Sequence, residues 1–127
     1  EFRRVLFRSN EEIYQDIDLL LFPSKLEGHS LVVLEAMSFG IPVLCTDYSP
    51  MNEYEENDLY KIKVKNFLEM EHVVNGPYAF VDIDDGANKL KEICSVNIFS
   101  KSIECYEKCR QQYSWDVLRD KYEELLS

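Results

Sequence analysis

The stretch that decides the fold is residues 18–47, which read DLLLFPSKLEGHSLVVLEAMSFGIPVLCTD. Its first part, Leu19 to Phe22, is a short continuous apolar run, which predicts a strand covered on both faces, and Pro23 ends that strand. Val43 to Thr46 forms a second apolar run and predicts another buried strand. With one helix between them, the two strands are expected to form a parallel βαβ unit with a right-handed connection.

The connecting helix is predicted from Leu31 to about Phe39 by the residues at its two ends. Ser30 is a favourable N-cap residue, and Gly28 before it permits a tight turn. Gly40 stands where a glycine commonly follows the last turn of a helix, and a proline comes soon after it. The helix is therefore expected to have sharp limits on both sides.

Glu35 is the one charged side chain between His29 and Thr46, and it lies inside an otherwise apolar helix. Glutamate is almost never fully buried without a partner, so Glu35 needs a partner, an opening to solvent or a polar ligand. The alternative is a structural role, in which the positive end of the helix dipole stabilises the carboxylate.

Ligands of open parallel sheets bind beyond the carboxyl ends of the strands, and Glu27 to Ser30 lie there. The unpaired N–H groups at a helix start suit a phosphate. Glu35 is five residues beyond Ser30, about 7.5 Å further along the helix at the usual rise per residue. Because carboxylates accept hydrogen bonds from sugar hydroxyls, the layout predicts a nucleotide sugar, with its hexose at one carboxylate and its ribose at the other.

The segment from Glu27 to Met37 resembles the E-x7-E motif of retaining GT-B glycosyltransferases of the group 1, or family 4, type. The flanking segments 18–24 and 40–47 also resemble that family, and Glu53 stands where the family commonly has a glutamate. The run Tyr113-Ser114-Trp115-Asp116 resembles the family signature before its last helix. The resemblance is specific over residues 18–53 and 113–126 and poor over 54–80.

The resemblance implies an α/β fold, namely the parallel-sheet Rossmann-like half of a GT-B C-terminal domain, truncated at its N-terminus. It implies transfer of a hexose-type sugar in polysaccharide biosynthesis from a UDP- or GDP-sugar, without a cofactor or metal, and predicts that this part is inactive alone. An N-terminal acceptor domain of the same polypeptide would complete the cleft. Glu27 would act in catalysis and bind the transferred sugar, and Glu35 would bind the ribose. The donor would contact Glu27, Gly28, His29, Ser30, Leu31 and Glu35.

Two segments depart from the family pattern. The turn Tyr48-Ser49-Pro50-Met51-Asn52 lacks the usual glycines. Residues 60–65 alternate polar and apolar like one exposed strand, and this connection is longer than is typical of the family. Both departures bear on which base and which sugar of the donor the protein prefers, and neither changes the expected class of enzyme. Lys25, the one basic residue near the motif, is expected to be a solvated loop lysine.

The first nine residues, EFRRVLFRS, can be encoded by a sequence that resembles a common sequencing adapter read in frame. We therefore predict that residues 1–9 are an artefact of the DNA source and that residues 10–127 are a partial donor-binding domain. The alternative is a native strand or helix end.

Composition limits the partners and the compartment. The formal net charge of −10 argues against direct contact with nucleic acid or an anionic membrane surface. The four cysteines lack CxxC spacing, and a reducing, cytoplasmic setting is the simplest expectation. Cys105 and Cys109 are four residues apart on a predicted helix, so core packing is favoured over metal binding or redox chemistry.

Four further elements are predicted downstream: a strand at 78–83 and helices at 86–95, 100–113 and 116–126. The acidic cluster Asp82, Asp84 and Asp85 indicates a strand-to-helix turn rather than a cation site. The run from Glu53 to Asp58 indicates a solvated loop, and His72 indicates a surface or satisfied histidine rather than a ligand. The last helix carries an apolar stripe that includes Tyr122, Leu125 and Leu126 and, in the resembled family, crosses onto the acceptor domain.

A second reading of the function remains open. The chain would then be a non-catalytic, Rossmann-like nucleotide-binding or interaction module in which Glu35 is a tolerated polar residue. An upstream acceptor domain and a basic residue at the donor phosphates would support the enzyme, whereas a complete stand-alone gene that starts near Asn10 would support the module.

Overall fold

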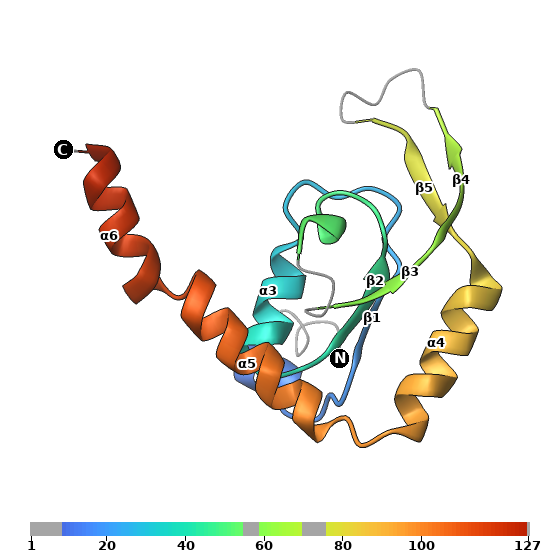
Figure 1. Ribbon diagram of the computed structural model, residues 1–127, viewed down its shortest axis with the longest axis horizontal. Helices are drawn as coiled ribbons and strands as arrows, with labels where there is room; N and C mark the ends of the chain where they lie inside the picture. The colour runs from blue at the N-terminus through green and yellow to red at the C-terminus, as the bar shows by residue number, and fades with distance from the viewer. Residues whose placement is uncertain (1–8, 55–58, 70–75, 127) are drawn as a thin grey trace.

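The computed structural model describes residues 9–54, 59–69 and 76–126 (Figure 1). The described elements, in chain order, are α2 Asn10–Tyr14, β1 Leu20–Phe22, α3 Leu31–Ser38, β2 Val43–Thr46, the 3-10 turn η1 Met51–Glu53, β3 Tyr60–Ile62, β4 Val64–Leu68, β5 Tyr78–Val81, α4 Ile83–Ser95, α5 Phe99–Tyr113 and α6 Trp115–Leu126.

A three-stranded parallel sheet in the order β1-β2-β3 lies at the centre. Leu20 pairs with Val43 and Leu44 pairs with Tyr60, so β2 has a partner on both edges. The parallel βαβ unit predicted from residues 18–47 is therefore confirmed. Strands β4 and β5 form a separate antiparallel hairpin, which projects beside the loops that follow β1 and β2 (Figure 1).

Helices cover both faces of the sheet, which makes three layers. Successive side chains of a strand point to opposite faces. Val43 and Cys45 of β2 pack with residues of α3 and α5, whereas Leu44 between them packs with Ile93 of α4. All four residues of β2 are buried, as the continuous apolar run predicts. The architecture is thus mixed α/β and Rossmann-like.

Gly40 determines how α3 ends. Its φ angle is +71°, in the left-handed region that glycine adopts without a steric cost, and its N–H donates to the Met37 carbonyl at 2.9 Å. A Cβ built at Gly40 would lie 3.2 Å from the carbonyl oxygen of Ser102 in α5. The glycine therefore also allows α5 to approach α3 closely.

Two strand predictions need correction. β1 is not covered on both faces, since Leu21 remains 50% exposed. The predicted single exposed strand over residues 60–65 is two strands in two sheets: β3 joins the parallel sheet and buries Ile62, and β4 starts the hairpin. The free edge of β2 explains the difference, because it offers β3 a row of hydrogen-bonding groups.

Helix α4 begins at Ile83, three residues before its predicted start, and β5 ends correspondingly early. Asp82 is the reason: its side chain accepts hydrogen bonds from the N–H groups of Asp84 and Asp85, which is an N-cap. This confirms the expected strand-to-helix turn.

The last two helices agree with their predicted bounds to within one residue. Cys105 and Cys109 of α5 are buried in the core against α3, as expected from their shared face. In α6, which extends away from the sheet in Figure 1, no residue is buried. Leu125 and Leu126 are 80% and 87% exposed, in accord with the expected apolar surface.

Within the described segments, no helix combines the length and the apolar composition that crossing a membrane requires.

Candidate active site at the carboxyl edge of the sheet

The loop between β1 and α3, residues 23–30, lies at the carboxyl end of β1, where ligands of such sheets bind. Its base is attached to β2, because the hydroxyl of the fully buried Thr46 donates to the Ser24 carbonyl at 2.6 Å. Thr46 ends β2, so this bond places the start of the loop over the neighbouring strand.

Glu27 is oriented from within the loop. The Ser24 hydroxyl donates to Glu27 Oε1 at 2.5 Å, and it also lies 3.3 Å from the Leu26 carbonyl. The Glu27 residue is half-buried. A short hydrogen bond to a carboxylate is stronger than one between neutral groups, so Ser24 restricts where the carboxylate points. The sequence prediction did not give Ser24 this role, since it rests on a contact between two side chains.

Gly28, the residue after Glu27, is exposed and has open space around its Cα. A Cβ built at Gly28 would meet no atom within 4 Å, and its φ angle is not in the left-handed region. The expectation that Gly28 serves a tight turn through its backbone freedom is therefore not what the structure shows. Because glycine has no side chain, this part of the loop instead stays open.

The left-handed residue of this loop is Ser30, with φ 52° and ψ 50°. Such a conformation is uncommon for a residue other than glycine, and it clusters at functional sites. The Ser30 hydroxyl is buried and lies 3.0 Å from Met51 Sδ. Ser30 is the N-cap residue by position, as predicted, but its side chain does not cap the helix.

The first turn of α3 therefore receives no side-chain cap from Ser30. The N–H of Val33 donates to the Ser30 carbonyl at 2.9 Å. The N–H groups that precede it, at Leu31 and Val32, lie at the positive end of the helix and suit an anionic group. Leu31 is exposed, so this end is accessible to solvent.

His29 opens onto a cavity of about 240 Å³ whose other lining residues are Leu34, Pro50, Glu53, Tyr54 and Tyr113. The rings of Tyr54 and Tyr113 meet edge to face, with centroids 6.0 Å apart. Burial, followed by the neighbouring Tyr113, raises the pKa of Tyr54 to about 12. Tyr54 is therefore neutral at pH 7.

Tyr113 belongs to the run 113–116 that resembles the terminal family signature, and in the structure it lines the same cavity as His29 of the β1–α3 loop. Sequence reasoning attached no site to this tyrosine. The spacing gives no signal for it, because α5 must first pack on α3. Glu53, on the same cavity, accepts a hydrogen bond from the Ser49 hydroxyl at 2.7 Å.

Glu35 has an internal partner. The Tyr14 hydroxyl of α2 donates to Glu35 Oε2 at 3.1 Å, and the Tyr14 ring stacks on Phe39. Burial raises the pKa of Tyr14, and the hydrogen bond to Glu35 adds to this shift. The described structure thus places Glu27 and Glu35 with different partners, Ser24 and Tyr14, and the ribose role of Glu35 stays a prediction.

Lys25 is an exposed loop lysine, as expected, and it also has two contacts that the sequence did not predict. Its Nζ lies 4.5 Å from the centre of the Phe80 ring in β5, and its backbone carbonyl accepts a hydrogen bond from the Ala79 N–H at 2.8 Å. This lysine therefore connects the loop to the hairpin.

Among the described residues, no group of three or more His, Cys, Asp or Glu side chains could hold a metal ion. Asp82, Asp84 and Asp85 form the N-terminal turn of α4, as described above. His72 and residues 55–58 of the predicted acidic loop lie outside the described residues. Burial raises the pKa of the Cys45 thiol to about 12, so this cysteine is a neutral core residue at pH 7.

Comparison with known proteins identifies the family of the chain. Residues 4–92 match the family model described as "Glycosyl transferases group 1". The chain is also 30% identical over 87 residues to a protein of Haemophilus influenzae named "Uncharacterized glycosyltransferase". This match covers 62% of the chain and 24% of the relative, so the chain spans about a quarter of the length of the curated relative it matches. The chain belongs to the group 1 family of glycosyl transferases.

Proposed function

We propose that this chain is the nucleotide-sugar-binding part of a retaining glycosyltransferase, which transfers a hexose-type sugar from a UDP- or GDP-sugar to an acceptor. The observation that carries the proposal is the start of α3. There Ser24 binds the carboxylate of Glu27, the following Gly28 leaves open space, and Ser30 does not cap the helix start. A nucleotide sugar matches this arrangement, because its sugar hydroxyls can donate hydrogen bonds to the carboxylate and its diphosphate is an anion that suits the helix start.

The bond between the anomeric carbon and the diphosphate oxygen breaks in this reaction, and negative charge grows on the leaving phosphate. The backbone N–H groups around His29, Ser30 and Leu31 are proposed to stabilise that charge, as donors of an oxyanion hole do. Glu27 accepts hydrogen bonds from the sugar hydroxyls and steadies the positive charge that develops on the ring. We do not assign Glu27 as the nucleophile.

Glu35 is proposed to accept hydrogen bonds from the ribose hydroxyls. The helix rise carries the argument, because Glu35 follows the uncapped turn by about 7.5 Å, within the reach of a nucleoside diphosphate. Its second oxygen, Oε1, has no bond to Tyr14, which contacts Oε2.

The remaining parts of the proposal follow the family. No metal ion or cofactor is proposed to take part. An N-terminal acceptor domain of the same polypeptide is proposed to close the cleft, and the setting is cytoplasmic. No nucleic acid and no direct membrane contact are assigned to this part, in accord with its net charge of −10.

One observation favours a second candidate, a non-catalytic module of the same fold. Glu35 already has a partner in Tyr14, so its presence in an apolar helix does not by itself require a ligand. A purely structural Glu35 would matter for stability and not for nucleotide affinity.

Calorimetric titration of the chain with UDP-glucose, GDP-mannose, UDP and GDP separates the two candidates. The proposed function predicts weak but saturable binding of at least one donor, competed by the matching nucleoside diphosphate. It also predicts turnover only in the enzyme that contains the chain. Absence of turnover by that enzyme with every donor, whether or not a nucleotide binds, would favour the non-catalytic module.

A further inference from the structure

The β4–β5 hairpin contacts the loop that carries Glu27. On the edge of β5 that faces away from β4, the Ala79 N–H donates to the Lys25 carbonyl at 2.8 Å. The Phe80 ring lies 4.5 Å from Lys25 Nζ, within the range of a cation–π contact. Lys25 stands two residues before Glu27, so the hairpin holds the loop through backbone and side chain at that point.

The neighbouring carbonyl of the loop is held by a different element. Thr46 at the end of β2 donates to the Ser24 carbonyl at 2.6 Å, while the Ser24 hydroxyl bonds to Glu27. Two consecutive carbonyls, those of Ser24 and Lys25, are thus fixed by two different elements. This arrangement limits the positions open to Ser24, and through Ser24 those open to the Glu27 carboxylate.

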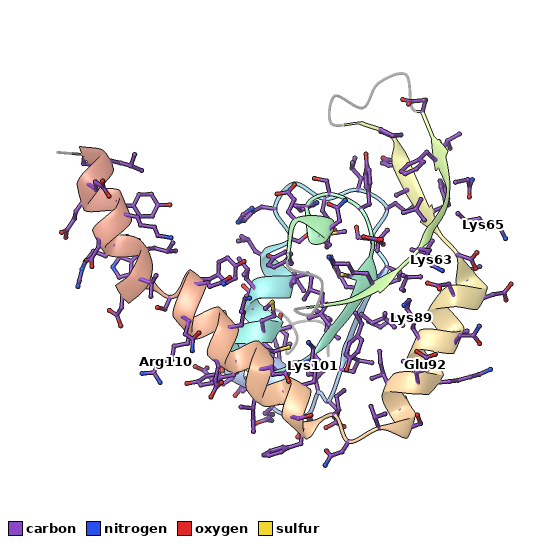
Figure 2. The ribbon with its side chains drawn as sticks, viewed as in Figure 1. Lys63, Lys65, Lys89, Glu92, Lys101 and Arg110 are labelled. Carbon is purple, nitrogen blue, oxygen red and sulfur yellow. The ribbon has the colours of Figure 1, made fainter. Side chains whose placement is uncertain are left out.

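The hairpin is itself attached to the sheet. The Phe67 ring of β4 meets Tyr48, which follows β2, edge to face at 5.3 Å between centroids. At its base, the Asp82 N–H donates to the Lys63 carbonyl at 2.8 Å. Figure 2 shows Lys63 and Lys65 near the first turns of α4, at the base of the hairpin. Because these contacts hold the two strands in place, the strands can in turn hold the loop in place at Lys25.

We infer that the β4–β5 hairpin is a strap that positions Glu27, with Lys25 and Phe80 as its positioning residues. Neither residue needs to touch the donor. The inference rests on the proposed function of Glu27 as the carboxylate that binds the sugar. The contact with Phe80 gives the Lys25 ammonium group a role other than binding the diphosphate.

The test uses the complete enzyme that contains this chain, with UDP-glucose and GDP-mannose as donors and water as acceptor. Water supplies the new hydroxyl of the free sugar, and its remaining proton is released with the nucleoside diphosphate. We expect Lys25→Met and Phe80→Leu to lower kcat about two- to fivefold, the factor that an exposed cation–π contact corresponds to. Affinity for free UDP or GDP stays at the wild-type value.

Two further variants serve as controls. Lys25→Arg should keep kcat at the wild-type value, because a guanidinium also stacks on an aromatic ring. Leu68→Ala removes an exposed apolar side chain from the same hairpin without touching the loop, and should leave kcat unchanged. Amide hydrogen exchange at Glu27 and Gly28 supplies a readout independent of turnover, and it should be faster in Phe80→Leu than in the wild type.

The possible failures are distinct. A wild-type enzyme that neither binds nor hydrolyses any donor contradicts the proposed function. An active wild type whose Lys25→Met and Phe80→Leu variants keep full kcat and unchanged amide exchange contradicts the strap alone. Loss of nucleotide affinity in Lys25→Met would also overturn the strap, since Lys25 would then bind the diphosphate, as would an equal loss of kcat in Leu68→Ala.

Discussion

Glu35 accepts a hydrogen bond from Tyr14 and is also the proposed ligand of the ribose. Variants that remove single groups can distinguish these two roles. Tyr14 contacts Glu35 Oε2 at 3.1 Å. Removing only this hydroxyl, in Tyr14→Phe, deletes the internal bond and keeps the carboxylate. Removing the carboxylate, in Glu35→Ala, deletes both the bond and the ribose ligand.

We predict that Glu35→Ala weakens donor binding by the complete enzyme about 10- to 100-fold, because a hydrogen bond to a charged group contributes roughly 1.5–3 kcal/mol. Tyr14→Phe should change donor affinity much less. The measurement is the dissociation constant of the donor by calorimetry. Equal losses in the two variants would assign Glu35 to the structure rather than to the ribose.

At the scale of elements, the two glycines that flank α3 make opposite predictions. Gly40→Ala places a Cβ at φ +71° and 3.2 Å from the Ser102 carbonyl, so it should destabilise the chain by more than about 1 kcal/mol. Gly28→Ala meets no atom within 4 Å and should leave stability unchanged, yet it narrows the space proposed for the sugar. Thermal unfolding and donor titration of both variants check this pair. Equal melting temperatures for Gly40→Ala and the wild type would contradict the packing of α5 on α3.

The N-cap of α4 gives the chain a pH-dependent stability. Hydrogen bonds from the backbone N–H groups, first that of Asp85, lower the pKa of Asp82 below its ordinary value of 3.8. Because the pKa is lower in the folded state, the stabilisation is fully present above about pH 4 and is lost as pH falls through the folded-state pKa.

Asp82→Asn keeps a capping side chain but removes its titration. Acid unfolding followed by circular dichroism should therefore show a weaker pH dependence below about pH 4 in this variant than in the wild type. Asp82→Ala, which loses the cap at every pH, should be less stable than the wild type at pH 7. Identical acid-unfolding curves for Asp82→Asn and the wild type would contradict the role of the charged cap.

The elements that the sequence predicts well are those whose signals are local. Examples are the apolar run of β2, the glycine after α3, and the two cysteines on one face of α5. Each of these patterns depends only on residues nearby in the sequence. The break between β3 and β4 at Lys63 has no such signal, because the pairing partners of the two strands decide it. The same holds for Tyr14, which lies 21 residues before Glu35 and becomes its partner only when α2 packs on α3. The position of the β1–α3 loop at the edge of the sheet could thus be predicted from the sequence, whereas the side-chain contacts of Ser24, Tyr14 and Phe80 could not.

At the scale of the whole molecule, α6 exposes the apolar stripe that the sequence predicts. Tyr122 is half-exposed, and Leu125 and Leu126 are almost fully exposed. We predict that the chain binds the dye ANS and self-associates, and that Leu125→Ser with Leu126→Ser reduces both. Dye fluorescence and analytical ultracentrifugation provide the measurements. A monomeric wild-type chain without dye binding would contradict an unpartnered α6.

The central claim is that the Glu27 carboxylate acts on the sugar during transfer, and Glu27→Gln tests it most directly. Glutamine keeps the shape of the side chain and removes its charge, so the interaction lost is one that grows in the transition state. In the complete enzyme, the account predicts that kcat falls by a larger factor than the donor KM rises. A wild-type kcat in Glu27→Gln would contradict the account, and a covalent glycosyl adduct trapped on Glu27 would show that this carboxylate is the nucleophile instead.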